Sequence, residues 1–485
     1  MTPPSHADGS RGGLLVAALG AAVLAYAVMQ TLVIPSFGLF ERDLHTTPAW
    51  AAWILTAFLL ISTVATPVAG RLGDRHGPRR VLLGVLWIYL GGNIASALAW
   101  NIGSLIVFRG ISGVAVAVLP LSFAIIRQAL PPGRVSPALG IVSGLIGGGG
   151  GLGLVIGGLL ADHASWRWLF GCCAILTAAA LAAVIRWIPR TVPGRGHGRQ
   201  DLPGMTALAG ALVTLMLALT EGPSWGWASP GVLAFLTAAC ALGAVLVTAE
   251  LRAGDPVVDV RSLAQAPMAV AHGAALLFGL VSYIFYVGLP SLIELPSATG
   301  YGLGKPVTQA ALCLLPTALL VVPASSLAGR LLPRTGAAPA LSGGLLLTAA
   351  GAALLAAFHA SPWQVVTCYL PCGPGAGLAL TALPALIRDH VPARETATAN
   401  GINTVARTVG GVIGTQITAV VLASVTAGHS AVPSAAAFRI LFWTGCATAA
   451  ATATIAILAR PRQPARTRSS REEALSHAPG EHQAT

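Results

Sequence analysis

The sequence is poor in charge. Only 9% of its 485 residues are Asp, Glu, Lys or Arg, 55% are hydrophobic, and the mean hydropathy is +0.76. Soluble domains carry roughly 25% charged residues, which cover their surface. The composition therefore excludes a soluble protein of several domains and indicates a protein embedded in a membrane.

Cysteine motifs and nucleotide loops are also missing. The seven cysteines have the spacing of neither a metal site nor a secretory disulfide framework, and all fall within apolar stretches. No P-loop is present, which excludes transport powered by a nucleotide-binding domain within this chain. We expect no metal and no cofactor, and we interpret the cysteines as small apolar residues.

What the sequence does have is a series of apolar runs. Runs of about 20 residues span about 30 Å of hydrocarbon as a helix. We predict an all-α membrane protein with fourteen spans at 14–39, 50–69, 81–100, 105–126, 136–160, 168–188, 205–220, 231–250, 268–293, 308–331, 338–358, 364–386, 398–424 and 437–459. The first span contains Ala25-Tyr26-Ala27, which mimics a signal-peptide cleavage site, but its apolar run is too long for a signal peptide.

Basic residues are divided unequally between the two sets of loops. Nearly all arginines between spans fall on one set, and the other set has only Arg42, Arg167, Lys305 and Arg439. Because basic loops stay in the cytoplasm, both termini are predicted to be cytoplasmic. This bias accounts for the net charge of +12 without a nucleic-acid partner. The basic tail 460–485 would at most lie against anionic lipid.

Two parts of the chain are related to each other. A shift of 259 residues lays "GRLGDRHG" (70–77) on "GRLLPRTG" (329–336), and a shift of 261 lays "IIRQALPPGRVSPALG" (125–140) on "LIRDHVPARETATANG" (386–401). We therefore predict two six-helix bundles in parallel repeat plus two inserted transmembrane helices. The predicted division is an N-tail 1–13, a first bundle 14–188, a linker 189–204, the inserted pair 205–250, a loop 251–267, a second bundle 268–459 and a C-tail 460–485.

The loop "GRLGDRHGPRR" (70–80) carries a family resemblance. Together with the repeat it resembles the fourteen-helix drug:proton antiporter branch of the major facilitator superfamily, whose two bundles surround a central cavity. The resemblance implies a cytoplasmic gate made by Gly70, Asp74, Arg75, Gly77, Arg79 and Arg80. Asp74 is suited to accept hydrogen bonds at a helix N-terminus of the opposite bundle. Since Pro333 stands at the repeat position, we expect an asymmetric latch.

Two further segments match the family pattern. "FRGISG" supplies Arg109 and Gly113 of the fourth-span signature, although Ser112 stands where the family usually has glutamine. A guanidinium within a span is functional by default, so Arg109 is predicted to line the cavity.

"GLIGGGGGLGLVIGG" (144–158) resembles the fifth-span antiporter signature through Gly149, Gly153, Gly157 and Gly158, with Leu154 in place of its proline. Small residues four apart allow close helix packing, and we expect this face to form the surface between the two bundles. A dinucleotide loop is the rival interpretation, but neither the strand before it nor the acid after it is present.

Acidic residues are scarce where a proton-coupled transporter needs them. The family often has an acid in the first span, where this chain has Met29, Gln30 and Thr31. On the ninth span a single helical face carries His272, Tyr283, Tyr286, Pro290 and Glu294. Glu294 is the acid nearest a cavity, and we expect this face to line the substrate path and Glu294 to exchange protons with the outside. The alternative is that Tyr283 and Tyr286 belong to the aromatic belt at the membrane interface.

The thirteenth span has a second polar face, with Asn403 and Arg407. Together with Gln30, Tyr283, Tyr286, Glu294 and Arg109, these residues make up the predicted cavity. Two interior arginines without an acid at the same depth favour neutral or weakly acidic amphiphiles over quaternary cations.

The predicted function is export of antibiotics or other amphiphilic small molecules by proton antiport with alternating access. A facilitator or importer of a metabolite has the same architecture and remains open. A membrane-embedded transferase would need clustered acids, for which only "RDH" at 388–390 is available, so we predict no enzyme. The expected partners are a small-molecule substrate, protons and lipid, and the expected state is a monomer.

Overall fold

The computed structural model describes residues 9–189, 202–252, 265–388, 391, 396–426 and 432–458. Most of the predicted linker 189–204, of the loop 251–267 and of both tails therefore lies outside the described residues, as do Asp389 and His390. Most of these residues are helical, and an isolated bridge joins Thr426 and Pro433.

The first half contains α1 (Gly9–Leu32), η1 (Ile34–Ser36), α2 (Phe37–Asp43), α3 (Pro48–His76), α4 (Pro78–Ala97), α5 (Ile102–Ser112), η2 (Gly113–Ala117), α6 (Val118–Ala129), α7 (Pro132–His163) and α8 (Arg167–Trp187). A pair follows, α9 (Leu202–Trp225) and α10 (Pro230–Arg252). The last part contains α12 (Ala266–Glu294), η3 (Ser297–Thr299), α13 (Val307–Thr335), α14 (Ala337–Ala357), α15 (Pro362–Tyr369), α16 (Cys372–Arg388), α17 (Thr396–Ser424) and α18 (Ala435–Leu458).

The described residues include fourteen segments long and apolar enough to cross a membrane, as predicted. α5, η2 and α6 together make one of these spans, and α15 and α16 together make another. Proline occupies the first turn of α3, α4 and α7, where the missing N–H has no intrahelical partner anyway. The all-α fold class is confirmed.

The packing of the first half is repeated in the last part of the chain. α1 packs against α7 and α8 as α12 packs against α17 and α18. The turns repeat too, because Gly77 after α3 and Gly336 after α13 both have positive φ, at 93° and 82°. These turns need glycine since a Cβ is strained there.

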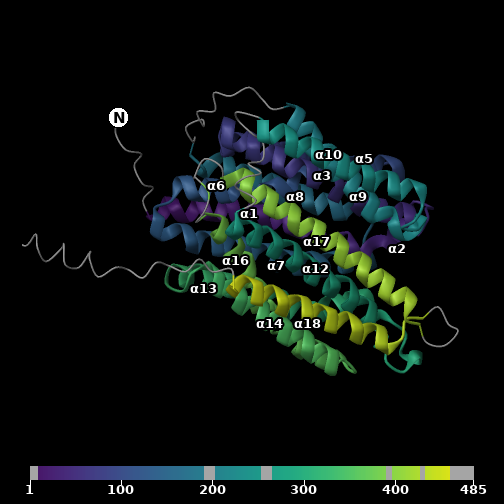
Figure 1. Cartoon of the computed structure of the whole chain (residues 1–485). Helices are drawn as coiled ribbons and strands as arrows, with labels where there is room; N and C mark the ends of the chain where they lie inside the picture. Colours follow the sequence, from purple (N-terminus) through teal and green to yellow (C-terminus); the bar gives the residue numbers. More distant parts are fainter. Residues whose placement is uncertain are drawn as a thin grey trace, which may run out of the picture.

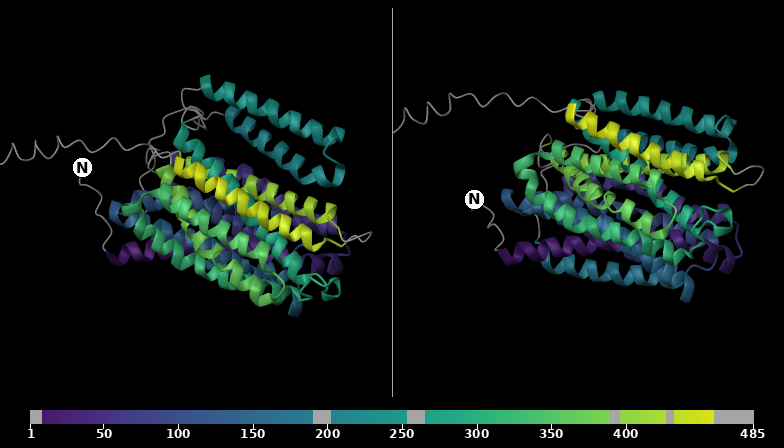
Figure 2. Two further views of the ribbon diagram at one scale, coloured as in Figure 1. Left: turned by 60° about the horizontal axis from the view of Figure 1, so that its bottom comes forward. Right: turned by 90° about the horizontal axis from the view of Figure 1, so that it is seen from below.

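Contacts between the halves also come in pairs. α7 packs along α13, and α17 packs along α3 (Figure 1). The pair α9 and α10 lies at the edge of the bundle, where α9 contacts α3 and α17 (Figure 2). All the long helices run roughly parallel to one another (Figure 2), as expected for membrane-spanning segments.

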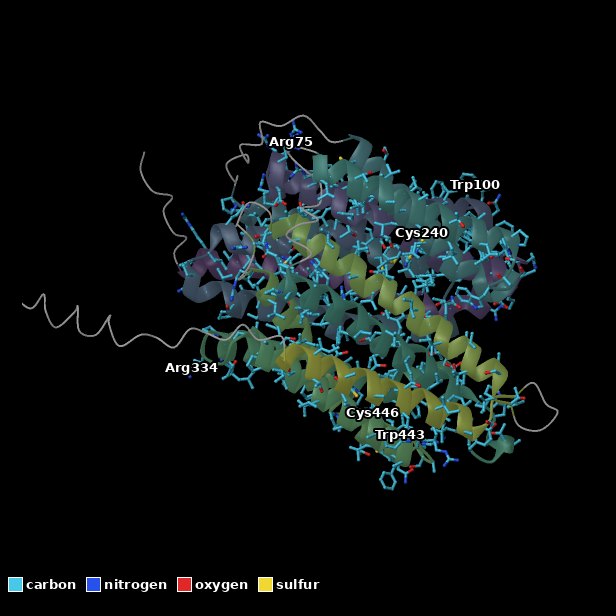
Figure 3. The ribbon with its side chains drawn as sticks, viewed as in Figure 1. Arg75, Trp100, Cys240, Arg334, Trp443 and Cys446 are labelled. Carbon is cyan, nitrogen blue, oxygen red and sulfur yellow. The ribbon has the colours of Figure 1, made fainter. Side chains whose placement is uncertain are left out.

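The two ends of the helices differ in composition. Arg75 and Arg334 lie at one end and Trp100 at the other (Figure 3). Exposed tryptophans at the Trp100 end include Trp168, Trp225 and Trp363. Such rings are typical of a membrane interface. We call the first end the Asp74 end, because Asp74 lies in the last turn of α3, next to Arg75.

Candidate functional site

Asp74 binds the first turn of a helix from the other half of the chain. Its Oδ1 accepts a hydrogen bond from the Ala397 N–H at 3.2 Å, and its Oδ2 accepts from the Thr398 N–H at 2.9 Å and from the Thr398 hydroxyl at 2.6 Å. The first N–H groups of an α-helix have no intrahelical acceptor, and an anion there interacts favourably with the helix dipole. A carboxylate on α3 therefore caps α17.

Glycine lets these two helices approach. A Cβ on Gly70 would lie 2.9 Å from the Ala397 carbonyl oxygen, and one on Gly401 would lie 3.3 Å from the Thr66 carbonyl oxygen. The repeat-related crossing of α7 and α13 uses Gly140 and Gly329 in the same way. Backbone contact at both crossings requires residues without side chains.

The other predicted gate residues, Gly77, Arg75, Arg79 and Arg80, lie at the same end but do not share the contacts of Asp74. Gly77 makes the turn between α3 and α4. Arg79 donates to the carbonyl of Ile188 at 2.8 Å, which ties α4 to the end of α8 within one half. Arg75 is half-buried and Arg80 is exposed at the same end.

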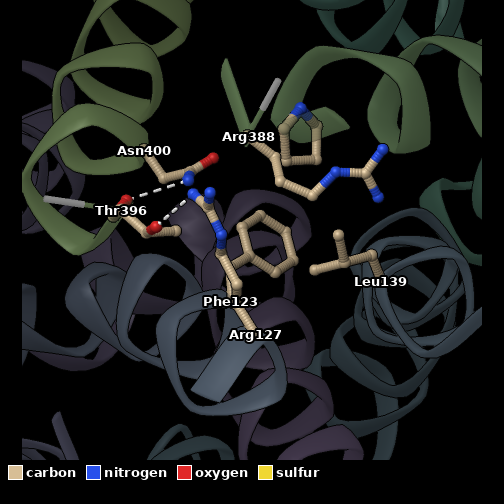
Figure 4. A pocket seen from close by; sticks show the side chains of 7 residues that line it. Phe123, Arg127, Leu139, Arg388, Thr396 and Asn400 are labelled. Carbon is tan, nitrogen blue, oxygen red and sulfur yellow. Dashed lines mark hydrogen bonds between the residues drawn. The ribbon is translucent and has the colours of Figure 1, made fainter. Parts of the chain in front are cut away.

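Two arginines related by the repeat cross between the halves in opposite directions. Arg127 on α6 donates to Thr396 Oγ1 at 2.6 Å and to the Val391 carbonyl at 2.9 Å. Arg388 on α16 donates to Ser136 Oγ at 2.6 Å, near the start of α7. Figure 4 shows both arginines entering one pocket from opposite sides.

This pocket lies between repeat-related residues. Its lining consists of Phe123 and Pro384, Arg127 and Arg388, Leu139 and Asn400, three pairs separated by 261 positions, together with Thr396. Its empty volume of about 190 Å³ is below the usual size of a drug pocket. The Asp74 end is thus closed by contacts between the halves.

A polar and aromatic group lies between the halves, nearer their middle. Gln30 Nε2 on α1 donates to the Tyr283 hydroxyl on α12 at 3.0 Å. The Tyr283 and Tyr286 rings meet edge to face, with centroids 5.8 Å apart. Arg407 lies on α17 one turn before Gly411, at which a Cβ would lie 2.7 Å from the Tyr283 ring, so Arg407 is on the face of α17 that packs against Tyr283. Its charge is also close enough to act on the hydroxyls of Tyr26 and Tyr286. We call Tyr26, Gln30, Tyr283, Tyr286 and Arg407 the central cluster.

Sequence reasoning missed Tyr26, although it lies four residues before Gln30 and thus on the same face of α1. Both halves contribute to the central cluster, since α1 belongs to the first and α12 and α17 to the second. Arg407 lies about 16 Å along α17 from Thr396, at 1.5 Å per residue. The cluster is therefore remote from the closed Asp74 end.

Arg109 lies outside the central cluster, in the interior of the first half. Its side chain is fully buried, with Nη2 donating to the Met29 carbonyl at 3.2 Å and the guanidinium 4.2 Å from the centroid of the Phe58 ring. Its Nε and Nη1 have no hydrogen-bond partner. Met29 precedes Gln30, so Arg109 touches the backbone of the cluster's own helix.

Two more residues that were predicted to line the cavity, Asn403 and Glu294, lie outside the central cluster. Asn403 donates to the Ala271 carbonyl at 3.0 Å and joins α17 to α12 within one half. Glu294 is exposed at the end of α12, about 16 Å beyond Tyr283 at 1.5 Å per residue. Glu294 shares a face of α12 with Tyr283, but this face continues beyond the central cluster to the C-terminal end of the helix, where Glu294 lies.

The glycines of α7 fall on two faces. Gly144, Gly147 and Gly151 face α13 of the other half, where a Cβ on Gly147 would lie 2.6 Å from Val321 Cγ1. Gly148 also faces α13, through Val322, and Gly158 faces Thr308.

The second glycine face corrects the prediction. Gly149, Gly153 and Gly157 face α1 of their own half, where Cβ atoms would meet Ala27, Val28 and the Leu32 carbonyl respectively. These three glycines therefore pack α7 inside one bundle and do not form the surface between the bundles. The reason is helical geometry: residues two apart point about 200° apart, so Gly149 and Gly151 face different neighbours. α7 is one helix without a preceding strand, so it forms no dinucleotide loop.

Comparisons with known proteins identify the architecture. A helical chain whose related halves meet over a polar centre is built as a membrane transporter. Residues 19–415 match the family model of the Major Facilitator Superfamily. The chain belongs to this superfamily and is a multi-pass membrane transporter of a small-molecule substrate, not an enzyme.

Several curated relatives are resistance proteins. The chain is 29% identical to the tetracenomycin C resistance and export protein of Streptomyces glaucescens, over 86% of this chain and 78% of that one. It is 31% identical to a puromycin resistance protein of Streptomyces alboniger, over 81% and 78%. It is 29% identical to a multidrug resistance protein B homolog of Mycobacterium tuberculosis, over 86% and 78%.

A solved structure supports the fold. The human organic anion transporter MFSD10 superposes with a TM-score of 0.60 at 15% identity, covering 94% of this chain and 99% of that one. At this identity the likeness concerns the fold alone.

Proposed function

We propose that the protein exports antibiotics or other amphiphilic small molecules by alternating access. The observation that carries this proposal is the contrast between one end, closed by hydrogen bonds between the halves, and a central cluster that both halves build. Rocking the halves about the cluster would open one end and close the other. The names of the relatives, which refer to resistance and export, favour the outward direction.

The Asp74 end is the cytoplasmic end in this proposal, and both termini lie on that side. Support comes from the arginines that gather there, because basic loops remain in the cytoplasm. The described conformation is then closed toward the cytoplasm. Breaking the contacts of Asp74, Arg127 and Arg388 admits substrate from inside the cell.

Inward proton flow is the proposed driving force, since the chain has no P-loop. Glu294 is exposed at the outer end of the helix that carries Tyr283 and Tyr286, so it is the proposed proton-exchanging group. The protein works as a monomer in this proposal, with lipid around the exposed apolar side chains. Glu294→Gln should abolish dependence of efflux on the pH gradient, and unchanged dependence would reject this residue.

A drug-susceptibility panel in an efflux-deficient host tests the function. Cells with the wild-type protein should survive some compounds that kill cells with Gln30→Ala or Tyr283→Ala at equal protein abundance, because both variants lose the hydrogen bond across the cluster. Gly243→Ala is the control, since nothing lies within 4 Å of a Cβ there. Resistance identical in all four strains would contradict a role for the central cluster.

A further inference from the structure

Arg407 is a cation in the middle of the molecule without a carboxylate beside it. Within the described part of the chain, its guanidinium forms no hydrogen bond and no ion pair. α1 and α17 contain no acidic residue, and on α12 the sole acid is the distant Glu294. A charge at this depth is costly unless a partner is supplied.

The surrounding side chains add donors rather than acceptors. Gln30 Nε2 donates to the Tyr283 oxygen, which leaves the Tyr283 hydroxyl hydrogen available to donate elsewhere. Among the described residues, the hydroxyls of Tyr26 and Tyr286 also form no hydrogen bond with the protein. Arg407 contributes several further N–H groups. The central cluster therefore holds donors that lack an acceptor.

The aromatic rings define the rest of the site. Tyr283 and Tyr286 meet edge to face, and the Tyr283 ring also lies against Gly411 of α17, where a Cβ would lie 2.7 Å from the ring. Both side chains, as well as Arg407 and Gln30, remain partly accessible although they lie between the halves. A ligand that matches the cluster has acceptor oxygens with negative charge attached to a flat apolar body.

We propose that the central cluster recognises an organic anion with an aromatic body, and that Arg407 is the residue that selects its charge. This inference rests on the proposed export function. The ligand's carboxylate, sulfonate or phenolate oxygen binds the Arg407 guanidinium and the Tyr283 hydroxyl. Its aromatic part packs against the accessible parts of the Tyr283 and Tyr286 rings.

The charge balance has a consequence for transport. With a monoanion bound, the site is neutral, and without it the site carries one positive charge. Each turnover therefore moves one negative charge out of the cell. A membrane potential that is negative inside the cell drives this export. For one charge, 100 mV raises the equilibrium ratio of outside to inside anion concentration about 50-fold, and the proton gradient acts in addition.

Two pyrene compounds that differ in charge test the proposal by direct binding. Fluorescence anisotropy of 1-pyrenesulfonate and of 1-pyrenemethylammonium is titrated with the purified full-length protein in detergent micelles. The sulfonate should bind at least about tenfold more tightly than the ammonium, the range expected for hydrogen bonds to a charged group. Equal binding of the two probes, or preference for the ammonium, would overturn the proposal.

Arg407 variants separate charge recognition from a structural role. Arg407→Gln should weaken sulfonate binding about tenfold and leave ammonium binding unchanged or stronger. Arg407→Lys should retain sulfonate binding within about threefold, because the charge remains. The matched control Arg439→Gln removes a cation from an exposed position on α18 and should change neither. Sulfonate binding that survives Arg407→Gln would overturn the role of Arg407.

Transport then distinguishes this inference from the proposed function. Proteoliposomes loaded with either probe are given a potassium diffusion potential without a pH gradient. Potential-dependent movement of pyrenesulfonate that Arg407→Gln abolishes supports the inference. Export of the ammonium alone leaves the exporter standing and rejects the anion. Transport of neither probe, with charge-selective binding intact, counts against the proposed function and not against the recognition site.

Discussion

Removing the Asp74 carboxylate should open the end of the protein that it closes. Asp74→Ala deletes the acceptor of three hydrogen bonds from Ala397 and Thr398. Each such bond to a charged group contributes about 1.5–3 kcal/mol in favourable surroundings, but Asp74 is half-buried and water replaces part of this. We therefore estimate a total loss of about 3 kcal/mol for the closed state, which shifts its ratio to the open state about 150-fold.

The assay is a distance between the halves at the Asp74 end. Spin labels at Arg80→Cys and Arg334→Cys, both exposed and on different halves, are introduced into a chain without its native cysteines. The distance distribution should gain a longer component in Asp74→Ala and less of it in Asp74→Asn, which keeps one acceptor oxygen. Asp43→Asn removes an exposed carboxylate elsewhere and is the control. A distribution that stays unchanged in folded Asp74→Ala protein would refute the latch.

The remaining predictions concern the contacts between and within the halves. Gly151→Leu should block transport without preventing membrane insertion, because the new side chain meets Ala318 of the other half. Transport into vesicles and the abundance of the protein in the membrane measure these two effects. Normal transport would contradict close packing of the two halves at Gly151. Arg127→Gln removes two hydrogen bonds between the halves and Arg388→Gln removes one, so each should weaken closure by about 1–2 kcal/mol, with the larger effect for Arg127→Gln. The same label pair measures this, and an unaltered distance would show that the two arginines are dispensable for closure. Arg109→Met should change the free energy of unfolding by about 1 kcal/mol or less, because two of the buried Arg109 nitrogens are unpaired. The same variant should abolish export, and full export would show that Arg109 serves packing alone.

The sequence was sufficient for the fold class and for the family. Fourteen apolar runs and a repeat at 259 to 261 residues predicted fourteen spans and two related bundles, since both patterns are properties of the chain alone. The resemblance of the loop 70–80 to the superfamily signature also implied that Asp74 accepts hydrogen bonds at a helix N-terminus of the other half. The contacts of Asp74 with α17 are now explicit.

Positions around and along each helix were harder to predict. Gly151 and Gly153 differ by two residues, and only the neighbours of α7 decide that one faces α13 and the other faces α1. Glu294 shares a helical face with Tyr283, yet periodicity gives no depth, and Glu294 lies at the exposed end of α12. Tyr26 was missed because a tyrosine in an apolar run gives no signal until α12 and α17 are placed beside it.

Export against a gradient is the central claim, and inverted membrane vesicles test it most directly. In the proposed orientation the Asp74 end faces the medium in such vesicles, and an energised membrane should drive accumulation of a compound identified in the susceptibility panel. The proposal predicts accumulation inside wild-type vesicles and none inside vesicles with Tyr283→Ala. Accumulation that occurs only in right-side-out vesicles, the direction of an importer, would contradict it.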